Sequence, residues 1–326
     1  MASSNWKPTA SMMAIKKRGA LYHAIRNYFA QQDVMEVEVP MLSLSATVDV
    51  YIDSFHSVFR AVSDTQTCYL HTSPEFAMKR LLSAGYGDIY SMGKVFRNGE
   101  SGRRHNPEFT LLEWYRVGMN EQQLMDDVTK LLASVSSFFE VKRCSYLALF
   151  QEMLGINPHT ASDDELCQLV EKRVDKQLKG LERNDCLDVL FSNLIEPEFD
   201  VSSEGLAGVF VYDYPASMSA LAKIKQNEEG QNVAARFELF VNGVELANGY
   251  HELLDSDEQL KRFKDEQKKR EARGFPVYPF DQHLVDALEH GMPDCAGVAL
   301  GIDRLLMLMM KTADISDVVA FSFDRA

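Results

Sequence analysis

The sequence predicts a protein of class α+β, in which helices accompany strands that pair as hairpins. Two apolar stretches, Ile89–Phe96 and Phe109–Tyr115, flank a polar loop with glycine and proline, a pattern typical of a hairpin. A second hairpin is predicted around the turn dipeptide Asn242-Gly243, between Arg236–Val241 and Val244–Ala247. Segments with helical spacing of apolar residues recur along the rest of the chain.

Each further element is predicted from the period of its apolar residues or from its charge pattern. Helices are expected at 14–32, 76–84, 120–142 and 255–273, with shorter pieces around 147–154, 163–174 and 184–194. Strands are expected at 34–42, where a proline ends the strand, at 209–215, and at 318–321. A glycine-punctuated strand at 297–305 is expected to run into an apolar helix, and 248–249 is expected to form another turn.

The chain is expected to form a single domain over 1–326. Its hydrophobic content of 46% is enough for one large core, and no internal repeat or low-complexity linker divides it. Residues 143–205 are mixed and polar and show no catalytic pattern. We interpret them as a helical insertion within that domain.

The composition makes the protein acidic, with a formal net charge of −14. Affinity for phosphate backbones comes largely from cationic contacts, so general binding of nucleic acid is not expected. Local basic loops can still hold a small anion.

Cysteine usage and hydropathy favour a soluble, cytoplasmic protein. The five cysteines are odd in number and scattered, without a Cys-x-x-Cys pair, which argues against a disulfide framework and a structural zinc site. The first residues are polar, and the apolar run Leu305–Met310 is far too short to span a bilayer. No association with a membrane is expected.

Cations are concentrated in and beside the loop of the first hairpin, at Arg97, Arg103, Arg104 and His105. On the residues alone, both a solvated surface loop and an anion-binding loop remain open. Because side chains alternate along a strand, Glu113 points the same way as the other odd-numbered residues from 109 to 115. Two polar tips on an apolar face, Glu113 and the hydroxyl of residue 115, suggest the floor of a pocket.

Carboxylates and a further arginine supply the remaining candidate chemistry. Glu245 and Glu252 are hard oxygen donors that suit Mg²⁺ bridged to phosphates, although two ordinary strand glutamates give the same pattern. Arg304 lies where a strand meets a helix and suits either a phosphate or an internal salt bridge. Glu75 follows Ser73-Pro74 at a predicted helix start, a position that the helix dipole alone favours.

The order of these segments resembles the class II aminoacyl-tRNA synthetases. Arg-His-Asn-Pro-Glu-Phe-Thr at 104–110 is similar to motif 2 of the lysine branch, and the helix-strand pair at 15–42 resembles motif 1. Residues 297–305 resemble motif 3, and Glu-Leu-Ala-Asn-Gly-Tyr-His-Glu at 245–252 is specific to the same branch. The resemblance covers nearly the whole chain and implies an antiparallel sheet flanked by helices, with ATP and Mg²⁺ as cofactors.

The resemblance also implies roles for individual residues. The catalytic residues would be Arg97 and Arg304. The ATP-binding residues would be Arg97, Asn98, Gly99, Glu100, Asn106, Glu245, Leu246, Gly301 and Arg304. The amino-acid substrate would be bound by Ser73, Pro74, Glu75, Tyr115, Glu252 and Ala299, and the metal by Glu245 and Glu252.

Within this family the chain resembles the short lysyl-tRNA synthetase paralogues, which ligate (R)-β-lysine to a lysine of translation elongation factor P. Motif 1 begins almost at the start of the sequence, so no N-terminal anticodon-binding domain is expected. For this reason, and because of the negative charge, tRNA is not expected to be the acceptor. The acceptor that the resemblance implies is the amine of a protein lysine. Motif 1 also implies a homodimer.

Two positions depart from the family pattern. The family usually reads Phe-Arg-Asn-Glu, whereas here Gly99 precedes Glu100, so that the adenine contact either shifts to Glu100 or is lost. Lysyl-tRNA synthetases usually have glycine where this chain has Ala299, and the extra methyl group would favour a differently shaped amino acid.

Two other functions remain open. One is a minimal ligase on the same scaffold that uses tRNA or ammonia as its acceptor. The other is a non-catalytic amino-acid sensor, which Gly99 favours. The presence of Arg97, Glu245, Glu252 and Arg304 argues against a sensor, because a sensor needs no full set of phosphate and metal groups.

Overall fold

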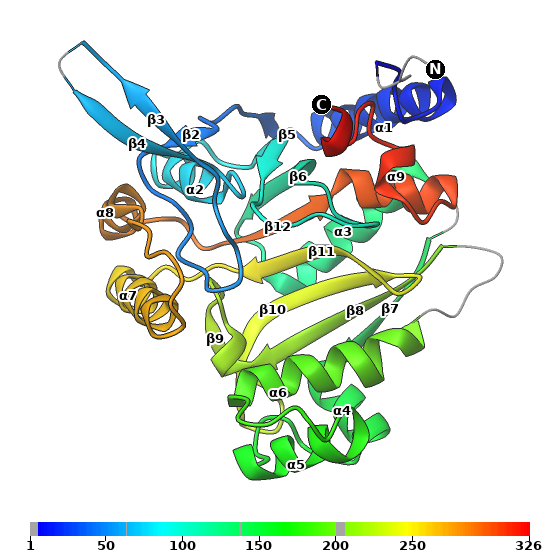
Figure 1. The fold of residues 1–326 in the computed structure, drawn as a ribbon, viewed down its shortest axis with the longest axis vertical. Coiled ribbons are helices and arrows are strands. Elements are labelled where there is room, and N and C mark those ends of the chain that lie inside the picture. The colour runs from blue at the N-terminus through cyan, green and yellow to red at the C-terminus, as the bar shows by residue number, and fades with distance from the viewer. Residues whose placement is uncertain (1–5, 63, 137–138, 200–205) are drawn as a thin grey trace. The chain divides into compact units, whose positions relative to one another are not determined.

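A computed structural model describes residues 6–62, 64–136, 139–199 and 206–326 (Figure 1). The chain divides into two compact units. Unit 1 comprises Met1–Gly118 and Leu254–Ala326, and unit 2 comprises Met119–Leu253. That the two units together form a single domain over 1–326 stays a prediction.

Unit 1 is organised around the first predicted hairpin, which is confirmed (Figure 1). Its sheet has the order β1 (Met35–Glu36), β5 (Ile89–Phe96), β6 (Glu108–Val117) and β12 (Cys295–Gly301), in which only the β1–β5 pair is parallel. A small second sheet joins β2 (Leu42–Ser43), β4 (Thr65–Leu70) and β3 (His56–Arg60). The helices are α1 (Met12–Gln31), α2 (Glu75–Ser83), α7 (Ser256–Ala272), α8 (Gln282–His290) and α9 (Ile302–Met310), with 3₁₀ turns η4 (Ile315–Asp317) and η5 (Phe323–Arg325).

The sequence explains both the start of helix α1, through its capping residue, and the face that the helix buries. Ser11 is its N-cap, and the Ser11 hydroxyl accepts a hydrogen bond from the Ala14 N–H at 3.1 Å. The apolar positions Leu21, Ile25 and Phe29 are buried along one face. The helix predicted at 14–32 is therefore confirmed, with its first turn two residues earlier.

Unit 2 is a mixed sheet with short helices against it (Figure 1). The strand order is β11 (Val244–His251), β10 (Asn232–Val241), β8 (Leu206–Pro215) and β7 (Phe139–Ser145), with β9 (Ile224–Gln226) also on β10. The β7–β8 pair is parallel and the other pairs are antiparallel. The helical elements are α3 (Glu121–Val135), α4 (Tyr146–Leu154), α5 (Asp163–Arg173), α6 (Arg183–Leu190), the π-helical η1 (Phe191–Ile195), and the 3₁₀ turns η2 (Glu196–Phe199) and η3 (Ala216–Met218).

An aromatic core holds the helices of residues 146–199, the helical subregion, onto β8 and β10. Tyr146 stacks on Phe150 with ring centroids 4.5 Å apart and lies 4.9 Å from the ring of Tyr214 on β8. Phe191 lies 5.5 Å from the ring of Phe240 on β10. The three helical pieces predicted here are confirmed.

The second predicted hairpin is also confirmed. Asn242 and Gly243 have φ angles of 48° and 67°, and two successive positive φ angles are what the tight hairpin turn needs. The turn predicted at 248–249 is wrong, because β11 continues through both residues and Gly249 pairs with Phe237.

Two predicted elements are too long. The helix predicted at 120–142 ends at Val135, and residues 139–142 belong to β7, whose parallel pairing with β8 has no local signal; 137 and 138 lie outside the described residues. Of the strand predicted at 34–42, only β1 and Leu42, the first residue of β2, are in strands. The Val37 N–H still donates to the Tyr90 carbonyl at 2.8 Å, and Pro40, which has no N–H, lies beyond the last ladder bond.

The strand predicted at 318–321 is wrong, because these residues form an irregular segment that follows the 3₁₀ turn η4. Side chains take the carbonyl groups that a neighbouring strand would use. Arg18 Nη2 donates to the Val318 carbonyl at 2.8 Å, and the Thr9 hydroxyl donates to the Val319 carbonyl at 3.0 Å.

Candidate functional site

The centre of the unit 1 sheet forms a polar floor bordered by small residues. Glu113 on β6 lies opposite Ser91 on β5 and Ala299 on β12, and Tyr115 lies opposite Gly297. The Tyr115 hydroxyl donates to Glu113 Oε1 at 2.7 Å, and both side chains are buried. The predicted common face of these two residues is confirmed. The neighbours on both sides of Glu113 are small and add little volume beside it, whereas Tyr115 has the larger Ile89 opposite it on β5.

Arg97 opens the basic loop (residues 97–107) immediately after β5. Its backbone N–H donates to the Pro107 carbonyl at 2.9 Å, which closes the base of the loop. The guanidinium lies 5.2 Å from the Phe109 ring centroid, and its Nη1 lies 3.8 Å from Glu100 Oε1, which is a long, half-exposed ion pair of small energy. Among the described residues, the buried Arg97 Nε has no hydrogen-bond partner. Such a donor is suited to an anionic ligand.

The two residues after Arg97 explain the departure from the family pattern. Asn98 Nδ2 donates to Asp53 Oδ2 at 2.8 Å, so this side chain is held by the protein itself. Gly99 has a φ angle of 81°, in the left-handed region that L side chains rarely adopt. The backbone at 99 is therefore adapted to glycine, and a glutamate there would be strained.

The tip of the basic loop reaches the arginine of the third motif. Gly102 and His105 exchange backbone hydrogen bonds at 3.0 and 3.2 Å. Arg304 Nη2 lies 2.8 Å from His105 Nε2, which must accept because a guanidinium only donates. Arg304 stands in the first turn of α9, after the N-cap Gly301. A Cβ built at Gly301 would make only ordinary contacts, so the protein's own packing does not require glycine there.

A buried carboxylate fixes the start of α9. Asp303 is 2% exposed, and its Oδ2 accepts the Thr110 N–H of β6 at 2.6 Å. Its Oδ1 accepts from Arg18 of α1, and the same guanidinium also donates to the Val318 carbonyl. This network positions the neighbouring Arg304 relative to β6.

Asn106, predicted to bind ATP, ties the loop to the end of the chain. Its Nδ2 donates to the Glu108 carbonyl at 2.6 Å, and its Oδ1 accepts the Phe323 N–H at 3.0 Å. The side chain is 9% exposed. A nucleotide contact from this amide stays a prediction.

The predicted amino-acid segment caps α2. The Ser73 hydroxyl accepts the Glu75 N–H at 3.3 Å, and Pro74 is the N-cap residue. Glu75 Oε1 accepts from Lys79 Nζ at 2.6 Å, one turn later, and Lys79 is 1% exposed. The charge of Glu75 is therefore balanced in part within its own helix.

In unit 2, the predicted carboxylates lie on β11 and just beyond its end. Glu245 pairs with Phe240, and Ala247 pairs with Leu239, so Leu246 is the extra residue of a β-bulge. Bulges occur next to active sites, where they redirect side chains. Glu252 is 1% exposed and forms an isolated bridge beyond the strand. At the usual strand rise, Glu245 and Glu252 are on the order of 20 Å apart, which favours different roles for them.

Sequence reasoning missed a charged cluster beside Glu245. The Arg236 side chain on β10 is only 15% exposed, donates to Glu238 and to Asn248 Oδ1 at 3.3 Å, and lies 4.7 Å from the Tyr214 ring. Burial raises the pKa of Glu238, Arg236 opposes that shift, and the charge of Glu245 adds to it. The carboxylates of Glu238 and Glu245 therefore repel one another electrostatically. The alternation Arg-x-Glu on one face of a strand was the available signal.

Within the ranges that the structure describes, no three His, Cys, Asp or Glu side chains gather so as to hold a metal ion. None of the helices in the described part of the chain is both long enough and apolar enough to cross a membrane.

The sheet, the three motif segments and the arginine-lined loop define a class II synthetase, and the comparison with protein families agrees. The model of the tRNA synthetases class II (D, K and N) matches residues 6–325, and the chain belongs to this family. Among curated proteins, the chain is similar to elongation factor P–(R)-β-lysine ligases. That of Vibrio parahaemolyticus is 45% identical over 99% of both chains, that of Vibrio cholerae 44% over 100% of both, and that of Yersinia enterocolitica 43% over 99% of both.

Proposed function

We propose that this protein activates (R)-β-lysine with ATP and transfers it to the ε-amino group of a lysine on translation elongation factor P, in the cytoplasm. The observation that carries the proposal is the similarity to relatives named elongation factor P–(R)-β-lysine ligase, which extends over essentially the full length of both chains. Family membership supports the ATP-dependent step, because it covers residues 6–325.

The first step needs positioned positive charge rather than covalent help from the protein. A carboxylate oxygen of the amino acid attacks the α-phosphorus, and pyrophosphate leaves. Donors that are fixed before the reaction stabilise the negative charge that develops. Arg97 is the candidate at the α-phosphate, because its buried Nε has no hydrogen-bond partner among the residues that the structure describes. Arg304 is the candidate at the γ-phosphate, held by His105 and by the network at Asp303.

In the second step the acceptor nitrogen attacks the carbonyl carbon of the adenylate, AMP leaves, and the nitrogen loses a proton. Glu75, Tyr115 and Glu252 are the groups proposed to hold the substrate ammonium groups. Support for Tyr115 comes from its position on the floor beside Glu113, with Ala299 one strand away. The methyl group of Ala299 on this floor is the feature proposed to favour a β-amino acid.

Magnesium is proposed to bind at Glu245, whose carboxylate is a hard oxygen ligand of the kind that Mg²⁺ prefers. When bound, Mg²⁺ neutralises charge on the triphosphate. The sequence alone suggested Glu252 as the second ligand, but the extended strand between Glu245 and Glu252 supports a role for Glu252 with the amino acid.

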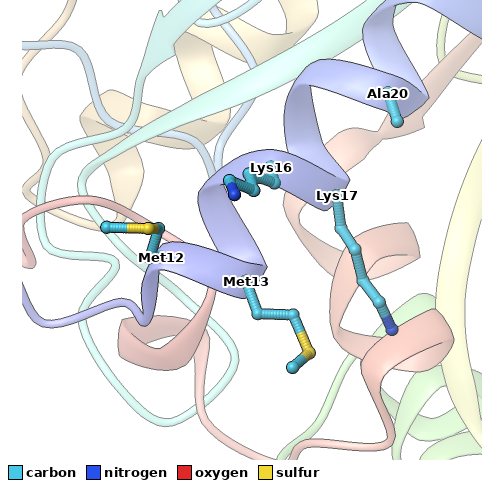
Figure 2. Close-up of a pocket in the computed structure, with 5 residues that line it drawn as sticks. All are labelled: Met12, Met13, Lys16, Lys17 and Ala20. Atoms are coloured by element: carbon cyan, nitrogen blue, oxygen red, sulfur yellow. The ribbon is translucent and has the colours of Figure 1, made fainter.

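A homodimer through α1 is part of the proposal. Figure 2 shows Met12, Met13, Lys16, Lys17 and Ala20 around a surface pocket on the first turns of α1. The side chains of Met12 and Met13 are 75% and 64% exposed, and exposed apolar groups that cluster mark an interface. Sedimentation of the wild type and of Met13→Glu tests it: the wild type should sediment as a dimer and the variant as a monomer.

ATP–pyrophosphate exchange with a panel of lysine isomers tests the activation step. We expect the highest kcat/KM with (R)-β-lysine, a lower value with α-lysine, and no exchange without an amino acid. Mass spectrometry of elongation factor P and of tRNA, incubated together with the enzyme, then identifies the acceptor. A charged tRNA beside unmodified elongation factor P would contradict the proposal and favour a tRNA ligase.

A further inference from the structure

The segment 49–53 is fastened to α7 by one buried arginine. Arg270 is 1% exposed. Its guanidinium donates to the Asp49 carbonyl at 2.5 Å, to the Ile52 carbonyl at 3.0 Å and to Asp53 Oδ1 at 3.1 Å. The ring of Tyr278 lies 4.5 Å from the same guanidinium. Because a buried guanidinium with several partners is costly to move, this end of the segment is a rigid support.

Asp53 divides its two carboxylate oxygens between that support and the basic loop. Oδ1 accepts from Arg270 and from the Tyr278 hydroxyl. Oδ2 accepts from Asn98 Nδ2 at 2.8 Å, and the Asp53 carbonyl accepts the Asn98 N–H at 2.9 Å. Asp53 therefore holds Asn98 at two points, the side-chain amide and the backbone N–H.

The position of Asn98 makes this contact consequential. It directly follows Arg97, and it precedes Gly99, which has a left-handed backbone. The path of the chain at Arg97 is thus set by the Pro107 carbonyl on one side and by Asp53 on the other. Loss of the Asp53 contact would leave the Arg97 guanidinium with a wider range of positions.

We propose that Asp53 is a positioning residue for ATP, which acts through Asn98 to hold Arg97 at the triphosphate. This inference rests on the proposed function, since it assigns ATP to the basic loop. Asp53 does not touch the nucleotide in this account. Its contribution is to fix, before ATP arrives, the geometry of an arginine that does.

Asp53→Asn separates the two halves of the contact. An amide has one accepting oxygen, and Arg270 with Tyr278 engages it, so the new NH₂ faces Asn98, whose amide turns to accept from it. The charge-assisted bond of the wild type is thereby replaced by a weaker bond between neutral groups. We expect the KM for ATP in pyrophosphate exchange to rise about fivefold, which corresponds to a loss of about 1 kcal/mol, with the KM for the amino acid unchanged. Glu266→Gln is the matched control, because Glu266 also joins α7 to the segment, at the Val50 N–H, and its other oxygen accepts from Lys269 of the same helix. It should leave the KM for ATP unchanged.

The same substitution in an Asn98→Ala background isolates the path of the effect. If Asp53 acts through Asn98, then Asp53→Asn changes the KM for ATP no further once the amide is gone. An equal rise in both backgrounds, or a rise that Glu266→Gln reproduces, would overturn the inference. A wild type without any exchange activity would overturn the proposed function and this inference with it, whereas an active wild type and an unaltered Asp53→Asn would overturn this inference alone.

Discussion

The basic loop of unit 1 and the helical subregion of unit 2 are built in opposite ways. In the loop, Arg103 and Arg104 are exposed, and backbone bonds at its base and tip define its course. In the helical subregion, Phe150 and Leu190 are completely buried and the helices are joined by aromatic packing. Packed apolar side chains hold a fold together, whereas charged side chains on a supported loop are available to a ligand.

This difference predicts a division of mutational effects. Substitutions in the basic loop should lower activity and leave the folded state nearly as stable as before. Substitutions in the helical subregion should lower the free energy of unfolding and leave activity intact wherever the protein remains folded. The experiments below test that division.

The largest effect is expected for Arg97→Ala. Removal of one preorganised charge from a phosphoryl transition state costs about 10³-fold in rate, so pyrophosphate exchange should fall by that order. The melting temperature should stay close to that of the wild type, because the Arg97 ion pair with Glu100 is long and half-exposed. Arg143→Ala, at a surface pair with Asp126, is the control and should keep wild-type exchange. A fall of less than tenfold in Arg97→Ala would contradict a catalytic role.

In the helical subregion, Phe150→Ala is the corresponding substitution. Phe150 is fully buried and stacks on Tyr146, so its loss should lower the free energy of unfolding by about 3–5 kcal/mol. Denaturant unfolding measures the free energy of unfolding. Exchange kinetics at a temperature where both proteins are folded measure the activity, which should be unchanged. If exchange is lost while circular dichroism shows a folded protein, the helical subregion takes part in function and the division fails.

Local patterns in the sequence predicted much of the fold, and the failures share a cause. The helix at 14–32 and the turn Asn242-Gly243 depend on neighbouring residues, and both are confirmed. β7 depends on a parallel partner more than sixty residues away, so the local pattern wrongly predicts a helix over its first residues, 139–142. Helix α8 was not predicted, although a capping aspartate, Asp281, starts it.

The candidate site shows the same limit. Arg97 and Arg304 were found from motif order, and the contact of Arg304 with His105 brings it to the loop that Arg97 begins. Asp53 carries no motif, and its partners Asn98 and Arg270 are 45 and 217 residues away. Such a residue is recognised only from coordinates. The positive φ angle of Gly99, which suits glycine and would strain a glutamate, is likewise seen only in the structure.

A smaller, pH-dependent effect is expected at His159 in the helical subregion. Burial, and then the nearby Arg183, lower the pKa of His159 to about 4. Its ring nitrogens have no hydrogen-bond partner among the described residues. In the unfolded chain the pKa is about 6.5, so the unfolded state binds the proton first. The stability that this neutral ring contributes is complete above pH 6.5 and is lost as pH falls towards 4.

The measurement is the difference in unfolding free energy between the wild type and His159→Gln across that range. The difference is needed because burial raises the pKa of Asp188 to about 6, and this carboxyl contributes with the opposite sign in the same interval. The stability of the wild type should fall more steeply towards pH 4 than that of the variant. Parallel curves would show that His159 does not titrate as stated.

The smallest effect is expected for Tyr146→Phe, and it sharpens the comparison most. The Tyr146 hydroxyl is buried and has no hydrogen-bond partner among the described residues. Loss of an unsatisfied hydroxyl should raise the free energy of unfolding by about 1 kcal/mol, since the aromatic contacts remain. Tyr214→Phe is the matched control with the opposite sign, because the Tyr214 hydroxyl donates to Glu238 at 2.7 Å. Because the Tyr146 hydroxyl lowers stability, a measurement of exchange activity decides whether it has a functional role. If Tyr146→Phe is more stable and keeps full exchange, the Tyr146 hydroxyl has no part in the reaction, as the division predicts. If it is more stable and loses exchange, that hydroxyl serves the reaction and the division fails.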